Sequence, residues 1–375
     1  MEQMPHKRPN NHLEQGGCKP LPLVPIKESN MKQEGENFRL WEYAVFAIIM
    51  LAVLVLCVSV GSVSVPFGNT ATIIWNTIFG LSIPGEISSP AIIYASRLPR
   101  VICVALVGAS LSLCGGAMQG LLKNPLADGS TLGVSSGASL GAVIAIAFGI
   151  TIPSLPFAGT IVMAILFAFL SLIIILSLAY KLDCSLSTNT IILIGVIYSM
   201  FVSSIMSLII TFASDKVKHI TFWTMGSLAG SSYRNALLLL ITLIVCSAVI
   251  LSQSRELNAF AIGEENAMHI GVNVRRVKLI ILITVSALIG VCVSIGGTIA
   301  FVGLVTPHIV RMLVGPNHRR LLPASLFGGA IFLMLADLLA RTLLNPLELP
   351  IGVVTSLIGA ALFVVIFYKI RSARG

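Results

Sequence analysis

Charged side chains are scarce in this sequence. Only 10% of its 375 residues are Asp, Glu, Lys or Arg, whereas soluble proteins contain about 25%. Hydrophobic residues make up 56% of the chain, and its mean hydropathy is +0.96. So few polar side chains could not enclose so much apolar material in water. The composition therefore excludes an ordinary soluble protein and indicates one that is embedded in lipid.

The sequence also lacks the pattern of a membrane β-barrel. Aromatic residues amount to 7%, and there are no segments of about ten residues with alternating polarity, which such barrels require. Long unbroken runs of Leu, Ile, Val and Ala are present instead. We therefore predict an all-α, polytopic membrane protein.

Motifs for nucleotide and metal binding are missing as well. There is no G-x-x-x-x-G-K-[ST] loop, no H-E-x-x-H pair and no EF-hand pattern. The seven cysteines form no C-x-x-C pair, and five of them fall in apolar runs as small core residues do. We predict no metal site, no catalytic residue and no cofactor on this chain, so any energy source must belong to a partner.

Acidic residues are nearly absent from the apolar segments. Ion-coupled carriers commonly place Asp, Glu or His there, and a membrane-embedded enzyme needs a cluster of them. Asp337 is the one acid well inside a segment, and Arg341 follows four residues later, so an ion pair on one helix accounts for it. A secondary, ion-coupled carrier of a small solute is the alternative interpretation and an enzyme the third, and this scarcity counts against both.

Ten apolar segments are long enough to be membrane-spanning helices, which need roughly 20 residues. The eighth is short and contains Pro307, so a broken helix is an alternative there. We expect the ten helices near residues 43–65, 100–122, 130–149, 157–180, 189–212, 235–252, 276–296, 298–314, 321–343 and 351–369.

The net charge of +9 reflects basic residues in the loops. Ten spans place both termini on one side, and eighteen of the 24 Lys and Arg residues then lie on that side. By the positive-inside rule we expect both termini in the cytoplasm, and we expect no nucleic-acid partner. The chain divides into a polar, disordered tail (1–42), a ten-helix domain (43–370) and a short C-terminal tail (371–375).

The fifth segment carries small residues at four-residue spacing, which places them on one helix face. They are Gly195, Ser199, Ser203, Ser207 and Thr211. Small residues allow close helix packing in membranes, and hydroxyl groups can also line a central path. Both interpretations stay open, and the second makes Ser199, Ser203 and Ser207 candidate path residues.

The predicted cytoplasmic segment 255–278 combines small and large apolar residues. If it is helical, Gly263, Ala267 and Gly271 share a face. A loop that is merely solvated needs no smooth face, so we interpret the segment as a docking surface for another protein. A structural turn between two spans is the alternative. The large apolar residues beside the small ones are Phe260, Ile262, Met268 and Ile270.

Several motifs, in order along the chain, resemble those of the FecCD-type permeases of ABC importers. The resemblance covers about residues 43–370. The motifs are Arg97-Leu98-Pro99-Arg100, Met118-Gln119-Gly120, Asn124-Pro125-Leu126-Ala127-Asp128, Leu132-Gly133-Val134-Ser135, Gly303-Leu304-Val305-Thr306-Pro307-His308-Ile309-Val310-Arg311, Asn317-His318-Arg319-Arg320-Leu321-Leu322-Pro323 and Glu348-Leu349-Pro350-Ile351-Gly352-Val353-Val354-Thr355.

The resemblance implies a transport subunit of an ATP-driven importer in the cell membrane. It would pair with a second permease, identical or different, to enclose the path of a metal chelate. A ferric siderophore is the first choice, with haem and cobalamin as the other chelates. ATP and Mg²⁺ would be bound by separate cytoplasmic ATPase subunits, and an extracytoplasmic binding protein would deliver the substrate.

The resemblance also assigns a role to three arginines. Arg97, Arg100 and Arg341 match outer positions that meet carboxylates of the binding protein, a role that suits guanidinium groups. The alternatives are anchoring at the membrane interface and, for Arg341, pairing with Asp337.

Two further groups of site residues follow from the resemblance. Ser187, Thr188 and Asn189 match the loop that narrows the cytoplasmic exit. A coupling loop at 255–275 matches the contact with the ATPase. Its candidate contact residues are Gly263, Glu264, Ala267, Met268, Ile270 and Gly271.

Overall fold

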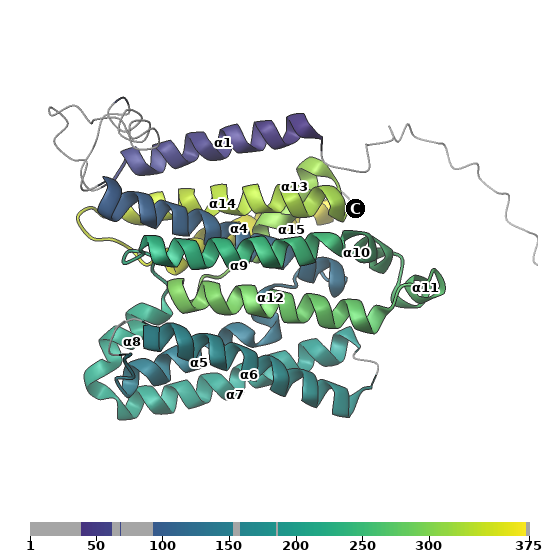
Figure 1. Cartoon of the computed structure of the whole chain (residues 1–375), viewed down its shortest axis with the longest axis horizontal. Coiled ribbons are helices and arrows are strands. Elements are labelled where there is room, and N and C mark those ends of the chain that lie inside the picture. Colours follow the sequence, from purple (N-terminus) through teal and green to yellow (C-terminus); the bar gives the residue numbers. More distant parts are fainter. Residues whose placement is uncertain (1–38, 62–67, 69–92, 153–157, 185–186, 373–375) are drawn as a thin grey trace, which may run out of the picture. The chain divides into compact units, whose positions relative to one another are not determined.

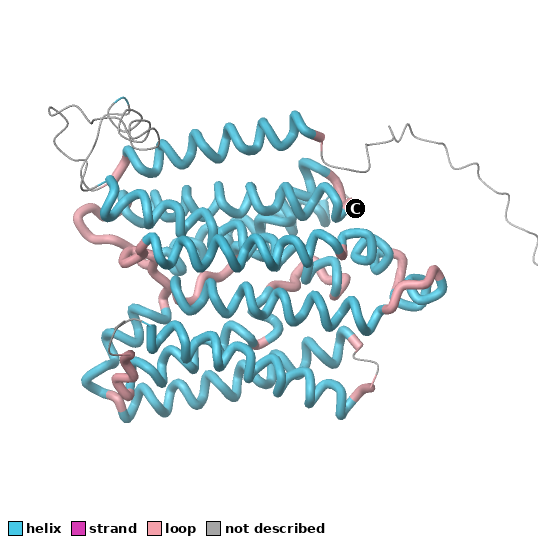
Figure 2. Tube along the Cα trace, viewed as in Figure 1, coloured by secondary structure: helices cyan, strands magenta, loops and turns pink. Residues whose placement is uncertain are grey.

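The computed structural model describes residues 39–61, 68, 93–152, 158–184 and 187–372. These residues form helices and loops and contain no β-strand (Figure 1, Figure 2). Most of the predicted tail 1–42 and residues 373–375 lie outside the described residues, so their predicted disorder stays a prediction.

Each of the ten predicted segments corresponds to one apolar helix. Seven of the described helices are long and apolar enough to cross a membrane. Helices α5 and α13 are shorter than expected, whereas α15 spans the whole of the predicted segment 351–369. The prediction of an all-α, polytopic membrane protein is confirmed. The helices are α1 (Leu40–Ser59), α4 (Leu98–Leu121), α5 (Val134–Ala147), α6 (Ala158–Leu182), α7 (Thr188–Phe212), α9 (Tyr233–Ser252), α12 (Val274–Gly296), α13 (Val302–Val314), α14 (His318–Thr342) and α15 (Ile351–Ser372).

Two of the short helices begin after a non-helical stretch of chain. Between α4 and α5 the chain forms only a 3₁₀ turn, η2 (Gly129–Leu132), and between α12 and α13 residues 297–301 are not helical. Such backbone occurs at membrane depth only where protein surrounds it or where it lines a cavity. In the eighth predicted segment, 298–314, the helix begins only at Val302, after a non-helical stretch. Pro307 lies inside α13 and does not end it.

Helix α4 lies at the centre of the packing and contacts α14, α13, α12 and α9. Glycines bring these backbones together. A Cβ atom built on Gly108 would lie 2.3 Å from the carbonyl oxygen of Gly329, and one on Gly115 would lie 1.8 Å from that of Gly303. Any larger residue would push the helices apart, so these glycines determine which helices α4 can contact.

Polar contacts identify two ends of the helix assembly. At one end, Glu42 near the start of α1 pairs with Arg320 near the start of α14. At the other, Arg341 in the last turn of α14 donates to the carbonyl of Cys57 in α1. Helices α1 and α14 are thus parallel, as the first and ninth spans must be. We call these ends the Glu42 end and the Arg341 end, and which one faces the cytoplasm stays a prediction.

The predicted docking segment lies at the Glu42 end but is not one helix. It contains α10 (Ser254–Ala261), the six-residue α11 (Glu264–His269) and the start of α12 (Figure 1). Gly263 (φ 117°) and Gly271 (φ 91°) adopt backbone conformations that favour glycine, and they bracket α11. These breaks prevent Gly263, Ala267 and Gly271 from forming the continuous face expected of a single helix.

Candidate functional site

The three predicted docking arginines gather at the Arg341 end, where they join two carboxylates. Nε and Nη2 of Arg100 donate to Oδ1 of Asp337 (3.1 and 2.9 Å), and Nη1 donates to Oε2 of Glu348 (2.8 Å). Nε of Arg341 lies 2.9 Å from Oδ2 of Asp337, which confirms the ion pair expected from their spacing. We call Arg97, Arg100, Asp337, Arg341 and Glu348 the arginine cluster.

Two of these arginines, Arg97 and Arg341, also hold the last turn of α1. Nη1 of Arg97 donates to the carbonyls of Val58 (3.0 Å) and Ser59 (3.1 Å). Nη2 of Arg341 donates to the carbonyl of Cys57 (3.0 Å). A helix leaves its last carbonyls without partners and carries partial negative charge there, so cations at this position are favourable.

All three arginines are at most 8% exposed. Their guanidinium groups are therefore engaged inside the chain, and their contact with a binding protein stays a prediction. Glu348 is the accessible member of the cluster, with 38% of its side chain exposed. The sequence predicted only the pair of Asp337 and Arg341; the pairs of Arg100 with Asp337 and Glu348 were not predicted, because they join residues far apart in the chain.

The predicted ATPase contacts divide into buried and exposed residues. Ala267 is fully buried, whereas Met268 and Ile270 are more than half exposed, as is Ile262 just before Gly263. We call Ile262, Met268 and Ile270 the apolar patch. Exposed apolar side chains on and beside a short helix outside the predicted spans are what a protein partner would cover.

The predicted exit residues begin α7. The hydroxyl oxygens of Ser187 and Thr190 lie 2.9 Å apart, and the backbone N–H of Ser187 donates to Oδ2 of Asp183 (3.1 Å). Thr188 is the first residue of α7, and its hydroxyl donates to Oε1 of Glu264 (3.1 Å). Asn189 is exposed. This end of α7 is thus connected to α11, although 76 residues separate Thr188 from Glu264.

The serine stripe of α7 faces away from most of the chain. Ser203 and Ser207 are exposed and Ser199 is half-buried. Two of these hydroxyls donate to carbonyls one turn earlier in the same helix: Ser199 to Gly195 (2.9 Å) and Ser207 to Ser203 (3.0 Å). These two hydroxyls therefore need no partner on another helix. Such residues can border lipid, a second subunit or a path, so both interpretations stay open.

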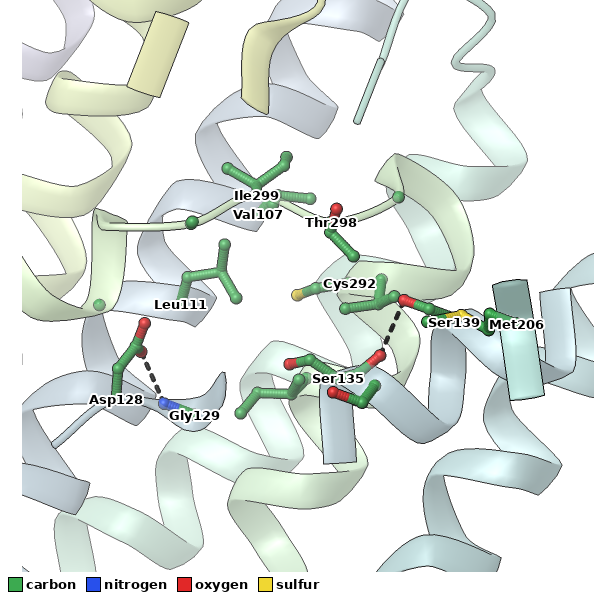
Figure 3. A pocket seen from close by; sticks show the side chains of 16 residues that line it. Val107, Leu111, Asp128, Gly129, Ser135, Ser139, Met206, Cys292, Thr298 and Ile299 are labelled. Carbon is green, nitrogen blue, oxygen red and sulfur yellow. Dashed lines mark hydrogen bonds between the residues drawn. The ribbon is translucent and has the colours of Figure 1, made fainter. Parts of the chain in front are cut away.

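A cavity of about 220 Å³ lies where the two non-helical stretches approach each other (Figure 3). Asp128, Ser135, Ser136, Ser139 and Thr298 supply its polar side chains, and Met206 of α7 closes one side. Most of the remaining wall is apolar. This cavity was not predicted, because Asp128-Gly129 in the sequence indicates only a turn.

The chain belongs to the FecCD transport family, because the family's model matches residues 48–369. It is 41% identical over 344 residues to the uncharacterized ABC transporter permease protein YvrB of Bacillus subtilis, covering 90% of this chain and 96% of the relative. It is 36% identical to the molybdate import system permease protein MolB of Haemophilus influenzae, covering 87% and 95%. It is 39% identical to the cobalamin import system permease protein BtuC of Halobacterium salinarum, covering 74% and 73%.

A solved structure of a candidate metal-chelate type ABC transporter, in an inward-facing conformation, is also similar. It is 33% identical, covers 87% of this chain and 98% of that chain, and superposes with a TM-score of 0.76. The protein is therefore an ABC importer permease and a multi-pass membrane protein. The secondary-carrier interpretation receives no support from these relatives.

Proposed function

We propose that this chain is one of two permease subunits that enclose the path of a metal chelate through the cell membrane. Family membership and the similarity to the metal-chelate type transporter support this proposal. The exposed face of α7, with Ser203 and Ser207, is the surface that a second subunit would meet along the path. Relatives named for molybdate and cobalamin span different chemistries, so they do not select one substrate. We take a ferric siderophore, the first choice from the sequence motifs, as the first substrate to test.

The energy for transport would come from separate ATPase subunits that dock on α11. The apolar patch supports this part of the proposal, because its side chains are exposed on α11 and beside both of its ends, in the segment between α9 and α12. ATP and Mg²⁺ would be bound by those subunits, and this chain would carry no cofactor.

An extracytoplasmic binding protein would dock at the Arg341 end. Glu348 is the accessible member of the arginine cluster, and it pairs with Arg100. Carboxylates of a binding protein would compete with Glu348 for the guanidinium of Arg100, which suits bidentate recognition.

Uptake in a strain that lacks this gene tests the proposal. Ferric siderophores, haemin, cobalamin and molybdate are supplied separately as labelled substrates. Uptake of a ferric siderophore that disappears in the deletion strain and returns with the wild-type gene would support the proposed substrate. Loss of molybdate uptake alone would contradict it, while leaving the permease assignment intact.

A further inference from the structure

The carboxylate of Glu264 joins three helices at the Glu42 end. Its Oε2 atom accepts a hydrogen bond from Nζ of Lys278 in α12 (2.7 Å), and its Oε1 atom accepts one from the hydroxyl of Thr188 in α7 (3.1 Å). Each oxygen thus serves a different helix. The resemblance had assigned Glu264 to the ATPase contact, but the structure directs its side chain into the chain's own helices.

The bond to Lys278 fixes α11 against α12. The side chain of Lys278 is fully buried, and a buried ammonium group is stable only when a counter-charge lies beside it. Glu264 supplies that charge. Hydrogen bonds between ionised groups are also shorter and stronger than neutral ones, which agrees with the 2.7 Å separation.

The bond to Thr188 fixes α11 against the start of α7. Thr188 is the first residue of that helix, where unpaired backbone N–H groups give partial positive charge. A carboxylate is favourable at this position both through the hydroxyl and through the helix dipole. Movement of Glu264 would therefore displace the first turn of α7.

A glycine lies at each end of helix α11. Gly263 and Gly271 lie at its two ends with positive φ angles, which allow the chain to turn there. The apolar patch is exposed around the same helix, with Met268 on α11 and Ile262 and Ile270 just outside it. One short element thus carries an exposed apolar surface and, through Glu264, a connection to the helix that bears the serine stripe.

We propose that Glu264 is the positioning residue through which movement of α11, imposed by the docked ATPase, reaches α7. This inference rests on the proposed function, because it takes an ATPase as the partner of the apolar patch. In this proposal the ion pair with Lys278 anchors Glu264 to α12, and the hydrogen bond with Thr188 transmits the movement to α7. The first turn of α7, with Ser187 and Asn189, then shifts when α11 shifts.

Substitutions of Thr188 test the transmitting contact without removing a charge. Thr188→Val keeps the shape of the side chain but loses the hydroxyl, and Thr188→Ser keeps the hydroxyl. The full transporter, with its ATPase, is reconstituted in liposomes, and uptake and ATP hydrolysis are measured together. We expect Thr188→Val to lower uptake per ATP hydrolysed roughly tenfold, the effect of losing a hydrogen bond to a charged group. Thr188→Ser should restore the ratio.

Variants that remove charges distinguish an effect on transmission from an effect on folding. Glu265 is an exposed carboxylate one position further along α11, so Glu265→Gln removes a charge from the same helix and should leave the ratio near that of the wild type. Glu264→Gln alone leaves Lys278 buried without a counter-charge and should reduce the amount of folded protein. Glu264→Gln with Lys278→Met removes both charges, keeps an acceptor for Thr188 and should restore folding and most of the ratio.

The outcomes distinguish this inference from the proposed function. If the wild-type chain does not assemble with an ATPase, the proposed function is wrong and the inference falls with it. If it assembles and transports, but Thr188→Val leaves the ratio of uptake to hydrolysis unchanged or lowers both equally, only the inference is overturned. A lower ratio in Thr188→Val with recovery in Thr188→Ser supports it.

Discussion

Arg100 and Asp337 lie 237 positions apart in the sequence and are joined by two hydrogen bonds, both to Oδ1 of Asp337. They connect α4 to α14 at the Arg341 end, where Asp337 also lies 2.9 Å from Nε of Arg341. One buried carboxylate thus lies between two buried guanidinium groups, and Glu348 supplies a second negative charge to Arg100. Asp337 makes the arginine cluster part of the framework as well as a candidate docking site.

The first prediction concerns this carboxylate. Asp337→Asn leaves Arg100 and Arg341 buried without their shared counter-charge, so we expect a loss of about 3–5 kcal/mol in stability. Glu348→Gln is the matched control: that side chain is 38% exposed, so its loss should cost only about 0–1 kcal/mol. Unfolding of the purified variants in detergent measures the difference, and equal losses would contradict the assignment of Asp337 as the central anion.

The second prediction concerns the binding protein. If acidic groups of that protein compete with Glu348 for Arg100, Glu348→Gln should raise its affinity severalfold at low ionic strength. The gain should shrink in 1 M salt, where charges are screened beyond about 3 Å. A pull-down with detergent-solubilised transporter at two salt concentrations measures it. Reversal of Arg97 and Arg100 to Glu is a poorer test, because it would place acids beside Asp337 and disrupt the cluster itself.

The third prediction concerns the apolar patch. Met268→Glu and Ile270→Glu should each abolish co-purification of the ATPase while leaving insertion and folding intact, because both side chains are more than half exposed. Cys184→Ser, an exposed change in the loop before α7, is the control and should co-purify normally. Ala267→Trp should instead fail to fold, because Ala267 is fully buried. Normal assembly of both Glu variants would remove the docking role of the patch.

The fourth prediction concerns the serine stripe. In a chain without its native cysteines, Ser203→Cys and Ser207→Cys should react with a small hydrophilic thiol reagent if their face borders a water-filled path. Val202→Cys is the control, because Val202 is 1% exposed and should stay protected. Protection of all three positions would mean that this face borders lipid or packs closely against a second subunit. A disulfide between two copies of the Ser203→Cys chain would show that it packs against a second copy.

The purified chain alone also allows a direct check of where ATP is used. Its sequence contains no phosphate-binding loop, so we expect neither ATP binding nor hydrolysis until an ATPase subunit is added. Hydrolysis by the isolated, homogeneous chain would contradict the division of labour proposed above.

The location of the helices was predictable from the sequence for a simple physical reason. Lipid offers backbone N–H and C=O groups no partners, so long apolar runs must satisfy them internally as helices. The pair of Asp337 and Arg341 was predictable for a similar reason, since four-residue spacing on a helix sets their distance. Both inferences use only local periodicity.

The contacts between helices required the tertiary structure. Local spacing says nothing about which helices meet, so the bonds of Arg100 to Asp337 and of Glu264 to Thr188 could not be inferred. The break at Gly263 was missed, and a break in the eighth segment was expected only as an alternative, because apolar composition does not distinguish a helix from buried non-helical backbone. The sequence by itself determined a helical membrane protein with ten apolar segments. Close packing at Gly108 and Gly115, which only the tertiary structure shows, brings α4 against α14 and α13, and α4 and α14 are the helices that carry Arg100 and Asp337.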